Sequence, residues 1–135
     1  MRIPKIACKI EAYAAVNPSE DPEKVKIAVS KVFQSSDYIY KEGSIKATSN
    51  ELDSLLKIQE TIKKYRTNRV YRRQMRYNTK ADTTWFYLNK QAAFVDVVAI
   101  CEEADESAMG PIKVIIHSKD LDKIMDWLAP EIVTG

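Results

Sequence analysis

The residue types that build most catalytic, metal-binding and phosphate-binding motifs are scarce in this sequence. Its 135 residues include one histidine, two cysteines and three glycines. No Gly-x-Gly-x-x-Gly or Walker-type loop exists, because the three glycines lie far apart in the sequence. Cys8 and Cys101 have no Cys-x-x-Cys partner and no neighbouring histidine, so we expect small buried hydrophobic residues of strands rather than a zinc site or a redox pair. The lone His117 ends a predicted strand, and no Ser-His-Asp or Cys-His site is predicted.

Long apolar runs are missing as well. The longest nearly apolar stretch, residues 92–101, contains Asp96 and is too short to span a bilayer. No charged and then apolar segment opens the chain, so we expect a cytoplasmic protein without a membrane partner. The composition, 45% hydrophobic and 30% charged, is that of a globular protein, and the length predicts a single domain over residues 1–135.

The net charge of +2 hides a strong separation of charge along the chain. Residues 61–81 hold eight basic side chains and no acidic one. Removing these eight from the chain's 21 bases leaves 13 bases against 19 acids, a net charge of −6 on the other 114 residues. Blocks of like charge are often interaction elements. We therefore expect a basic element on an acidic body.

Periodicity predicts the secondary structure. Alternating or continuous apolar residues indicate strands over residues 3–16, 37–41, 44–48, 85–88, 94–101 and 112–117, with Glu42-Gly43 as a tight hairpin turn and 94–101 in the centre of the sheet. Apolar residues at helical spacing indicate helices over residues 22–34, from about 51 to 77, and 119–128. The expected helix caps are Asp21 before Pro22, Thr48 or Asn50, and Ser118. Asn89-Lys90-Gln91 is expected to be a turn, and residues 102–109 an acidic loop.

The second of these helices changes phase along its length. Continued at 100° per residue, its apolar stripe would be followed by arginines, which do not extend a buried face. Either the helix runs past the edge of the core after Tyr65, or it breaks near Thr67-Asn68. We favour the break, with a new packing face formed by Val70, Tyr71 and Met75.

The predicted order is β-α-β-β-α(α)-β-β-β-α. This order indicates an α+β fold, with a largely antiparallel sheet of about five to six strands and three to four helices packed mainly on one face.

Several segments resemble a known family over nearly the whole chain. They are Asp21-Pro22-Glu23-Lys24-Val25, the middle-helix residues Gln59, Ile62 and Arg66, Phe86-Tyr87-Leu88-Asn89-Lys90-Gln91-Ala92-Ala93-Phe94, Gly110-Pro111-Ile112-Lys113-Val114 and Asp126-Trp127-Leu128-Ala129-Pro130. The sequence is similar to a family of short, functionally uncharacterised archaeal proteins that is described as predicted RNA-binding. The resemblance implies a fold like those of ribosomal protein L-five and double-stranded-RNA-binding domains, and makes RNA the expected partner.

The basic tract is the candidate site. Guanidinium groups bind phosphate in a bidentate manner, and interleaved tyrosines can stack on unpaired bases. For Tyr65 and Tyr71 we instead favour a role in anchoring the helix on the sheet. We expect the arginines to face solvent together, unneutralised, and to contact structured RNA independently of its sequence. The predicted RNA-binding residues are Lys63, Arg66, Arg69, Arg72, Arg73, Arg76, Tyr77 and Lys80, with Lys90 and Gln91 extending the surface.

Three other interpretations stay open. The tract is a solvated face neutralised by acids of the fold, such as Glu102, Glu103, Asp105 and Glu106. Alternatively, it docks on an acidic protein surface, including that of a second copy in a homodimer. As a third alternative, an acidic cluster, either this loop or Asp122 with Asp126, holds Mg²⁺ weakly, and with the acidic loop the protein would be a small metal-assisted hydrolase. We expect no enzymatic activity, cofactor, metal or small-molecule substrate.

Overall fold

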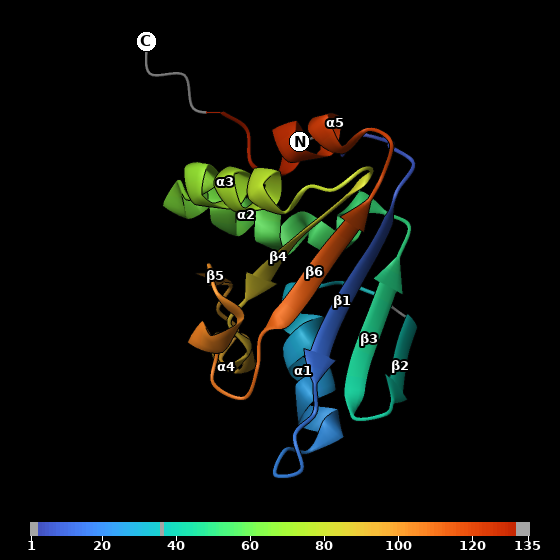
Figure 1. Cartoon of the computed structure of the whole chain (residues 1–135), viewed down its shortest axis with the longest axis vertical. Coiled ribbons are helices and arrows are strands. Elements are labelled where there is room, and N and C mark those ends of the chain that lie inside the picture. Colours follow the sequence, from blue (N-terminus) through green and yellow to red (C-terminus); the bar gives the residue numbers. More distant parts are fainter. Residues whose placement is uncertain (1–2, 36, 132–135) are drawn as a thin grey trace.

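The centre of the protein is one antiparallel sheet, seen in a computed structural model that describes residues 3–35 and 37–131 (Figure 1). Its strands are β1 (Lys9–Ala15), β2 (Asp37–Lys41), β3 (Ser44–Ser49), β4 (Thr83–Leu88), β5 (Ile100–Cys101) and β6 (Ile112–His117). They lie in the order β2-β3-β1-β6-β4-β5, and every neighbouring pair is antiparallel. The α+β class is therefore confirmed, as is the predicted antiparallel sheet.

Helices cover one face of this sheet. They are α1 (Pro22–Val32), α2 (Leu56–Tyr65), α3 (Asn68–Asn78), α4 (Lys90–Phe94) and α5 (Leu121–Leu128), with 3₁₀ turns η1 (Leu52–Leu55) and η2 (Ala104–Glu106). Alternate strand residues on the covered face are fully buried, as along β6, where Ile112, Val114 and Ile116 are inaccessible to solvent. The residues between them are only half-buried, and Figure 1 looks onto this second face, in front of which no helix lies.

Local signals place the first half of the chain as predicted. Asp21 caps α1, and its carboxylate accepts a hydrogen bond from the Glu23 amide at 3.0 Å, with Pro22 as the first helical residue. Glu42 and Gly43 both adopt positive φ, +53° and +76°, which is the conformation that a tight turn between β2 and β3 requires. The predicted break is also confirmed, because α2 ends at Tyr65 and α3 begins at Asn68.

Two predicted caps are wrong in detail. Neither Thr48 nor Asn50 caps the helical region that follows β3, since η1 intervenes with Glu51 at its cap, and the Ser49 hydroxyl accepts from the Glu51 amide. Ser118 lies two residues before the cap position, Asp120. Its hydroxyl accepts from the Asp120 amide at 3.0 Å, so it shapes the entry to α5 without capping it.

The predicted central strand over residues 94–101 is wrong. Asn89, expected in a turn, instead caps the short helix α4, and its side chain accepts a hydrogen bond from the Ala92 amide at 2.9 Å. The chain leaves this helix through Asp96 at φ +64°, and only Ile100–Cys101 pairs with β4, at the edge of the sheet. β6 and β1 occupy the centre instead.

The predicted first strand is too long. Strand pairing begins at Lys9, so residues 3–8 precede β1. The cysteines consequently differ from each other. Cys101 is buried in β5 as expected, whereas Cys8 is half-buried outside any strand, with its thiol 3.6 Å from the Asn50 carbonyl oxygen.

Candidate nucleic-acid interface

A left-handed residue separates the two basic helices. Arg66 follows α2 with φ +55° and ψ +43°, and the amides of Arg66 and Thr67 both bond to the Ile62 carbonyl oxygen, which ends the helix. The chain then starts α3 in a new phase. Tyr71 and Met75 turn inward, where the Tyr71 ring meets Phe86 edge-on at 5.4 Å between centroids. Arg69, Arg73 and Arg76 consequently face outward.

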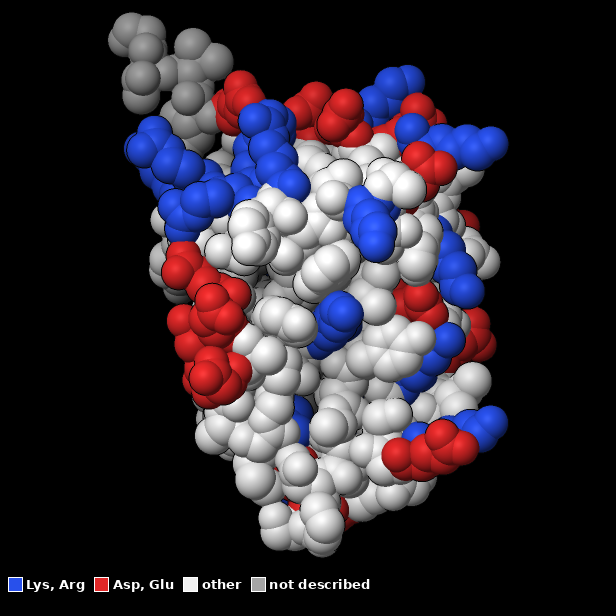
Figure 2. All heavy atoms as spheres, in the orientation of Figure 1, with Lys and Arg blue, Asp and Glu red and all other residues white. Residues whose placement is uncertain are grey.

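These arginines line a groove of about 790 Å³ beside the end of α5. Figure 2 shows the blue side chains gathered over α3, next to red acidic ones. The lining residues are Arg66, Asn68, Arg69, Arg72, Arg73, Arg76, Pro130 and Glu131. The structure therefore brings together all five predicted arginines. Sequence reasoning missed the wall that Pro130 and Glu131 supply, because its contact with α3 joins residues more than fifty positions apart.

The expectation that the tract is unneutralised is wrong for three arginines. Arg72 pairs with Asp126 at 2.9 Å and with Glu131 at 3.5 Å, Arg76 pairs with Glu131 at 3.0 Å, and Arg73 pairs with Glu102 at 2.6 Å. Of the four acids named as neutralising partners in the acidic loop, Glu102 alone has this role among the described residues.

The paired arginines fall into two kinds. The Arg72 side chain is only 11% exposed and also donates to the Ala129 carbonyl oxygen at 3.0 Å, so it ties α3 to the end of α5. Arg73 and Arg76 are 57% and 61% exposed, and such surface ion pairs contribute little and exchange readily. Within the described part of the chain, Arg66 and Arg69 form no ion pair.

The other predicted positions are exposed, with Lys63 on α2, Tyr77 on α3 and Lys80 just after α3. Tyr71 anchors α3 on the sheet as predicted. The same role for Tyr65 is wrong, because its side chain is 64% exposed, where the end of α2 leaves the core.

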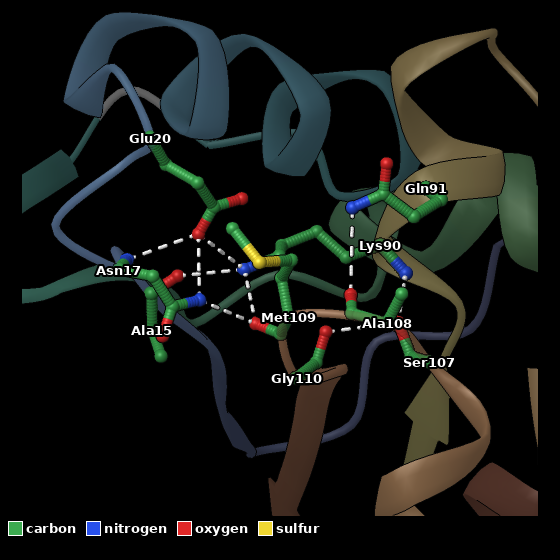
Figure 3. Close-up of polar contacts among 9 residues, drawn as sticks. All are labelled: Ala15, Asn17, Glu20, Lys90, Gln91, Ser107, Ala108, Met109 and Gly110. Atoms are coloured by element: carbon green, nitrogen blue, oxygen red, sulfur yellow. Dashed lines mark hydrogen bonds and ion pairs between the residues drawn. The ribbon is translucent and has the colours of Figure 1, made fainter.

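Lys90 does not extend the surface, contrary to prediction. Its side chain is completely buried (Figure 3), and its ammonium donates to the carbonyl oxygens of Ala15 at 2.8 Å and Met109 at 2.7 Å and to Glu20 Oε1 at 3.0 Å. Gln91, the next residue, is exposed, and its amide lies 3.4 Å from the Ala108 carbonyl oxygen. Because Asn89 starts a helix here, Lys90 points inward and Gln91 outward.

A second polar cluster lies on the sheet face without helices. Glu11 is buried there and accepts from Lys46 at 2.9 Å, from Tyr13 at 3.1 Å and from His117, whose Nε2 lies 2.8 Å away. Burial acts to raise the pKa of Glu11, but the hydrogen bonds from Lys46, His117 and Tyr13 outweigh it and lower the pKa to about 2. The cluster therefore carries an ionised carboxylate at all ordinary pH values.

Among residues 3–35 and 37–131, no group of three or more His, Cys, Asp or Glu side chains is arranged to hold a metal ion. Over the same residues no helix has both the length and the apolar character needed to cross a bilayer. The Trp127 indole nitrogen is the buried side-chain polar atom in this part of the chain that lacks a hydrogen-bond partner.

Fold and site together define a small α+β protein with a sheet open on one face and an arginine-lined groove at one end. The chain belongs to the family whose model is described as RNA binding, and the match covers residues 9–118. This membership confirms the resemblance drawn from the sequence.

Proteins similar to this chain include a sequence relative and two solved structures. A protein of Methanothermobacter thermautotrophicus called "UPF0201 protein" is 37% identical over 124 residues, 92% of each chain. The crystal structure of an uncharacterised UPF0201 protein is 28% identical with a TM-score of 0.78, and covers 94% of this chain and 97% of its own. A UPF0201 protein from Methanococcus jannaschii is 27% identical with a TM-score of 0.77, and covers 94% and 96%. None of these names indicates an enzymatic activity.

Proposed function

We propose that the protein binds the phosphate backbone of structured RNA through the arginine groove, independently of base sequence. The observation that carries this proposal is the alignment of five arginines along one groove, two of which have no ion pair among the described residues. Membership of a family described as RNA binding supports the same ligand.

The arginines differ in how they serve such a ligand. Arg66 and Arg69 are free to meet phosphate directly. Arg73 and Arg76 hold exposed carboxylates, and a phosphate oxygen is an equivalent acceptor for the same guanidinium donors. Arg72 stays tied to α5. The eleven residues of α3 extend over about 16 Å at 1.5 Å per residue, which is long enough to follow several phosphates.

Charge reversal tests the proposal. The double variant Arg66→Glu/Arg69→Glu is compared with Lys24→Glu/Lys41→Glu, which changes the net charge equally at exposed positions of α1 and β2. At low salt we expect the arginine variant to bind a blunt RNA duplex at least tenfold more weakly, and the lysine variant to stay close to wild type. Equal losses in both variants, or no loss in either, would contradict the proposal.

A protein partner is the second candidate, because carboxylates already occupy three of the arginines. Docking on an acidic protein, including a second copy of this chain, would use the same donors. Light scattering at low and high salt separates the two. If the protein associates in the absence of RNA and the association depends on salt, self-assembly is supported. A monomer at every salt concentration would exclude self-assembly through these arginines.

A further inference from the structure

The sheet face without helices carries an ordered set of aromatic and basic side chains. The strand register places Lys46, Tyr13, Lys113 and Tyr87 side by side across β3, β1, β6 and β4. The adjacent row on the same face contains Glu11, Ile115 and Trp85. Tyr13, Trp85 and Tyr87 thus lie on the sheet face in front of which no helix lies (Figure 1), and Figure 2 views the molecule from this side.

The charge on the four inner strands of this face is basic, and the exposed Asp37 lies on the same face at the edge of the sheet, on β2. Strands β3, β1, β6 and β4 contain a single acid, Glu11, and its carboxylate is already bound by Lys46 and His117. The Lys113 ammonium lies 4.8 Å from the centre of the Trp85 ring, and the Lys46 ammonium lies 5.3 Å from that of Tyr13. Each lysine is therefore held over an aromatic ring. Lys46 also pairs with Glu11, whereas Lys113 meets no carboxylate of these four strands.

We infer that this open face binds unpaired bases of RNA, which stack on Tyr13, Trp85 and Tyr87 while Lys113 contacts the backbone. The inference rests on the proposed function for its choice of ligand. It adds a second surface, which binds single-stranded RNA instead of structured RNA.

The geometry suits such a ligand. Trp85 and Tyr87 are two residues apart on one strand, which separates their rings by roughly 7 Å, and Tyr13 lies roughly 10 Å from Tyr87 across the intervening strand. Successive bases of a single strand can spread to these separations and stack on aromatic side chains. A lysine is flexible enough to leave the ring as a base arrives, and its ammonium then meets phosphate.

A second copy of the chain fits this face less well. Face-to-face association would bring two sets of lysines together. The single acid of these strands, Glu11, is already paired with Lys46 and His117 and cannot neutralise the lysines of a second copy. A polyanion supplies the charge that the face lacks.

The test uses two RNA probes with the full chain: an oligoadenylate without secondary structure, and a blunt duplex. The variants are Trp85→Leu, Tyr87→Leu and Lys113→Gln, and Tyr40→Leu is the control, because Tyr40 is exposed on β2 with its side chain on the other face. We expect each aromatic substitution to weaken oligoadenylate binding roughly tenfold and to leave duplex binding unchanged. Lys113→Gln, at a half-buried surface position with little risk to folding, is expected to weaken oligoadenylate binding about threefold and to lower its salt dependence.

The outcomes separate this inference from the proposed function. Binding of oligoadenylate that depends on Arg66 and Arg69 but not on Trp85 and Tyr87 overturns the inference and leaves the groove proposal intact. Loss of oligoadenylate binding in the face variants without any duplex binding by wild type supports the inference and overturns the groove proposal. Self-association that Trp85→Leu abolishes would show that a second copy covers the face, and would overturn the inference.

Discussion

Lys90 and Glu20 form a buried ion pair that joins three separate segments of the chain. The Lys90 ammonium is 3.0 Å from Glu20 Oε1 and also bonds to the Ala15 and Met109 carbonyl oxygens (Figure 3). Asn17 donates to the same carboxylate oxygen through its backbone amide at 3.0 Å and its side chain at 2.9 Å. The end of β1, the loop before α1 and the loop before β6 are thereby held around one ammonium.

Removing this ammonium should destabilise the protein strongly. Lys90→Met leaves the buried Glu20 carboxylate without its cationic partner and takes one donor from each of the Ala15 and Met109 carbonyl oxygens, so we expect the free energy of unfolding to fall by about 3–5 kcal/mol. Urea denaturation measures this change. The control Lys24→Met alters an exposed helical lysine and should stay within about 0.5 kcal/mol. A loss below about 1 kcal/mol for Lys90→Met would show that the network contributes little.

The double variant Glu20→Leu/Lys90→Met tests the pair itself. It removes both charges together, so we expect a loss smaller than the sum of the two single losses by about 1–3 kcal/mol. Strict additivity in urea denaturation would mean that the two residues do not interact.

Stability should depend on pH through Glu11. Its pKa is about 2 in the folded state against an ordinary 4.5, so the folded protein gains stability that is fully present above pH 4.5 and is lost as pH falls towards 2. We expect Glu11→Gln to cost about 2 kcal/mol at neutral pH and progressively less below pH 4.5. Thermal unfolding of both proteins across this range measures the difference. The exposed Glu60→Gln serves as the matched control, and a Glu11→Gln deficit that is constant with pH would contradict the assignment.

RNA binding through the groove should be strongly salt-dependent. Contacts from Arg66, Arg69, Arg73 and Arg76 to four phosphates predict a slope of log K against log salt of about −3 to −4. For Arg66→Glu/Arg69→Glu the slope should fall to about half of that value. Fluorescence anisotropy of a labelled duplex over a series of salt concentrations measures both slopes. A slope near zero for wild type would exclude phosphate contacts as the main source of affinity.

A substitution at Arg66 should affect RNA binding without lowering the stability of the fold. Its backbone is left-handed, a conformation that glycine adopts without the steric cost that a side chain imposes. We expect Arg66→Gly to leave the unfolding free energy within about 0.5 kcal/mol of wild type or to raise it. The same variant should bind the duplex more weakly, and its slope of log K against log salt should be smaller by the amount that about one phosphate contact contributes. Arg69→Gly, in the first turn of α3, should instead cost up to about 1 kcal/mol. Urea denaturation and anisotropy on the same samples check both, and a clear destabilisation by Arg66→Gly would contradict this account of the helix break.

Local chemistry in the sequence determined much of this fold. Asp21 before Pro22 starts α1, Glu42-Gly43 makes the hairpin turn, and the arginines that interrupt the apolar stripe require a new helix phase near Thr67. Each of these features depends on residues a few positions apart, so it can be predicted from the sequence without knowledge of the fold. The same holds for the position of the arginines on the outer face of α3.

Tertiary structure alone decided the remainder. A short apolar run such as residues 94–101 is compatible with strand or helix, and only its limited pairing with β4 at the edge of the sheet resolved it. Lys90 is buried because Glu20 and two carbonyl oxygens from distant segments meet its ammonium. The neutralisation of Arg72 depends on Asp126, 54 positions away, which the fold of α5 brings within 2.9 Å. Charge in a sequence can be counted, but which charges meet is set by long-range packing.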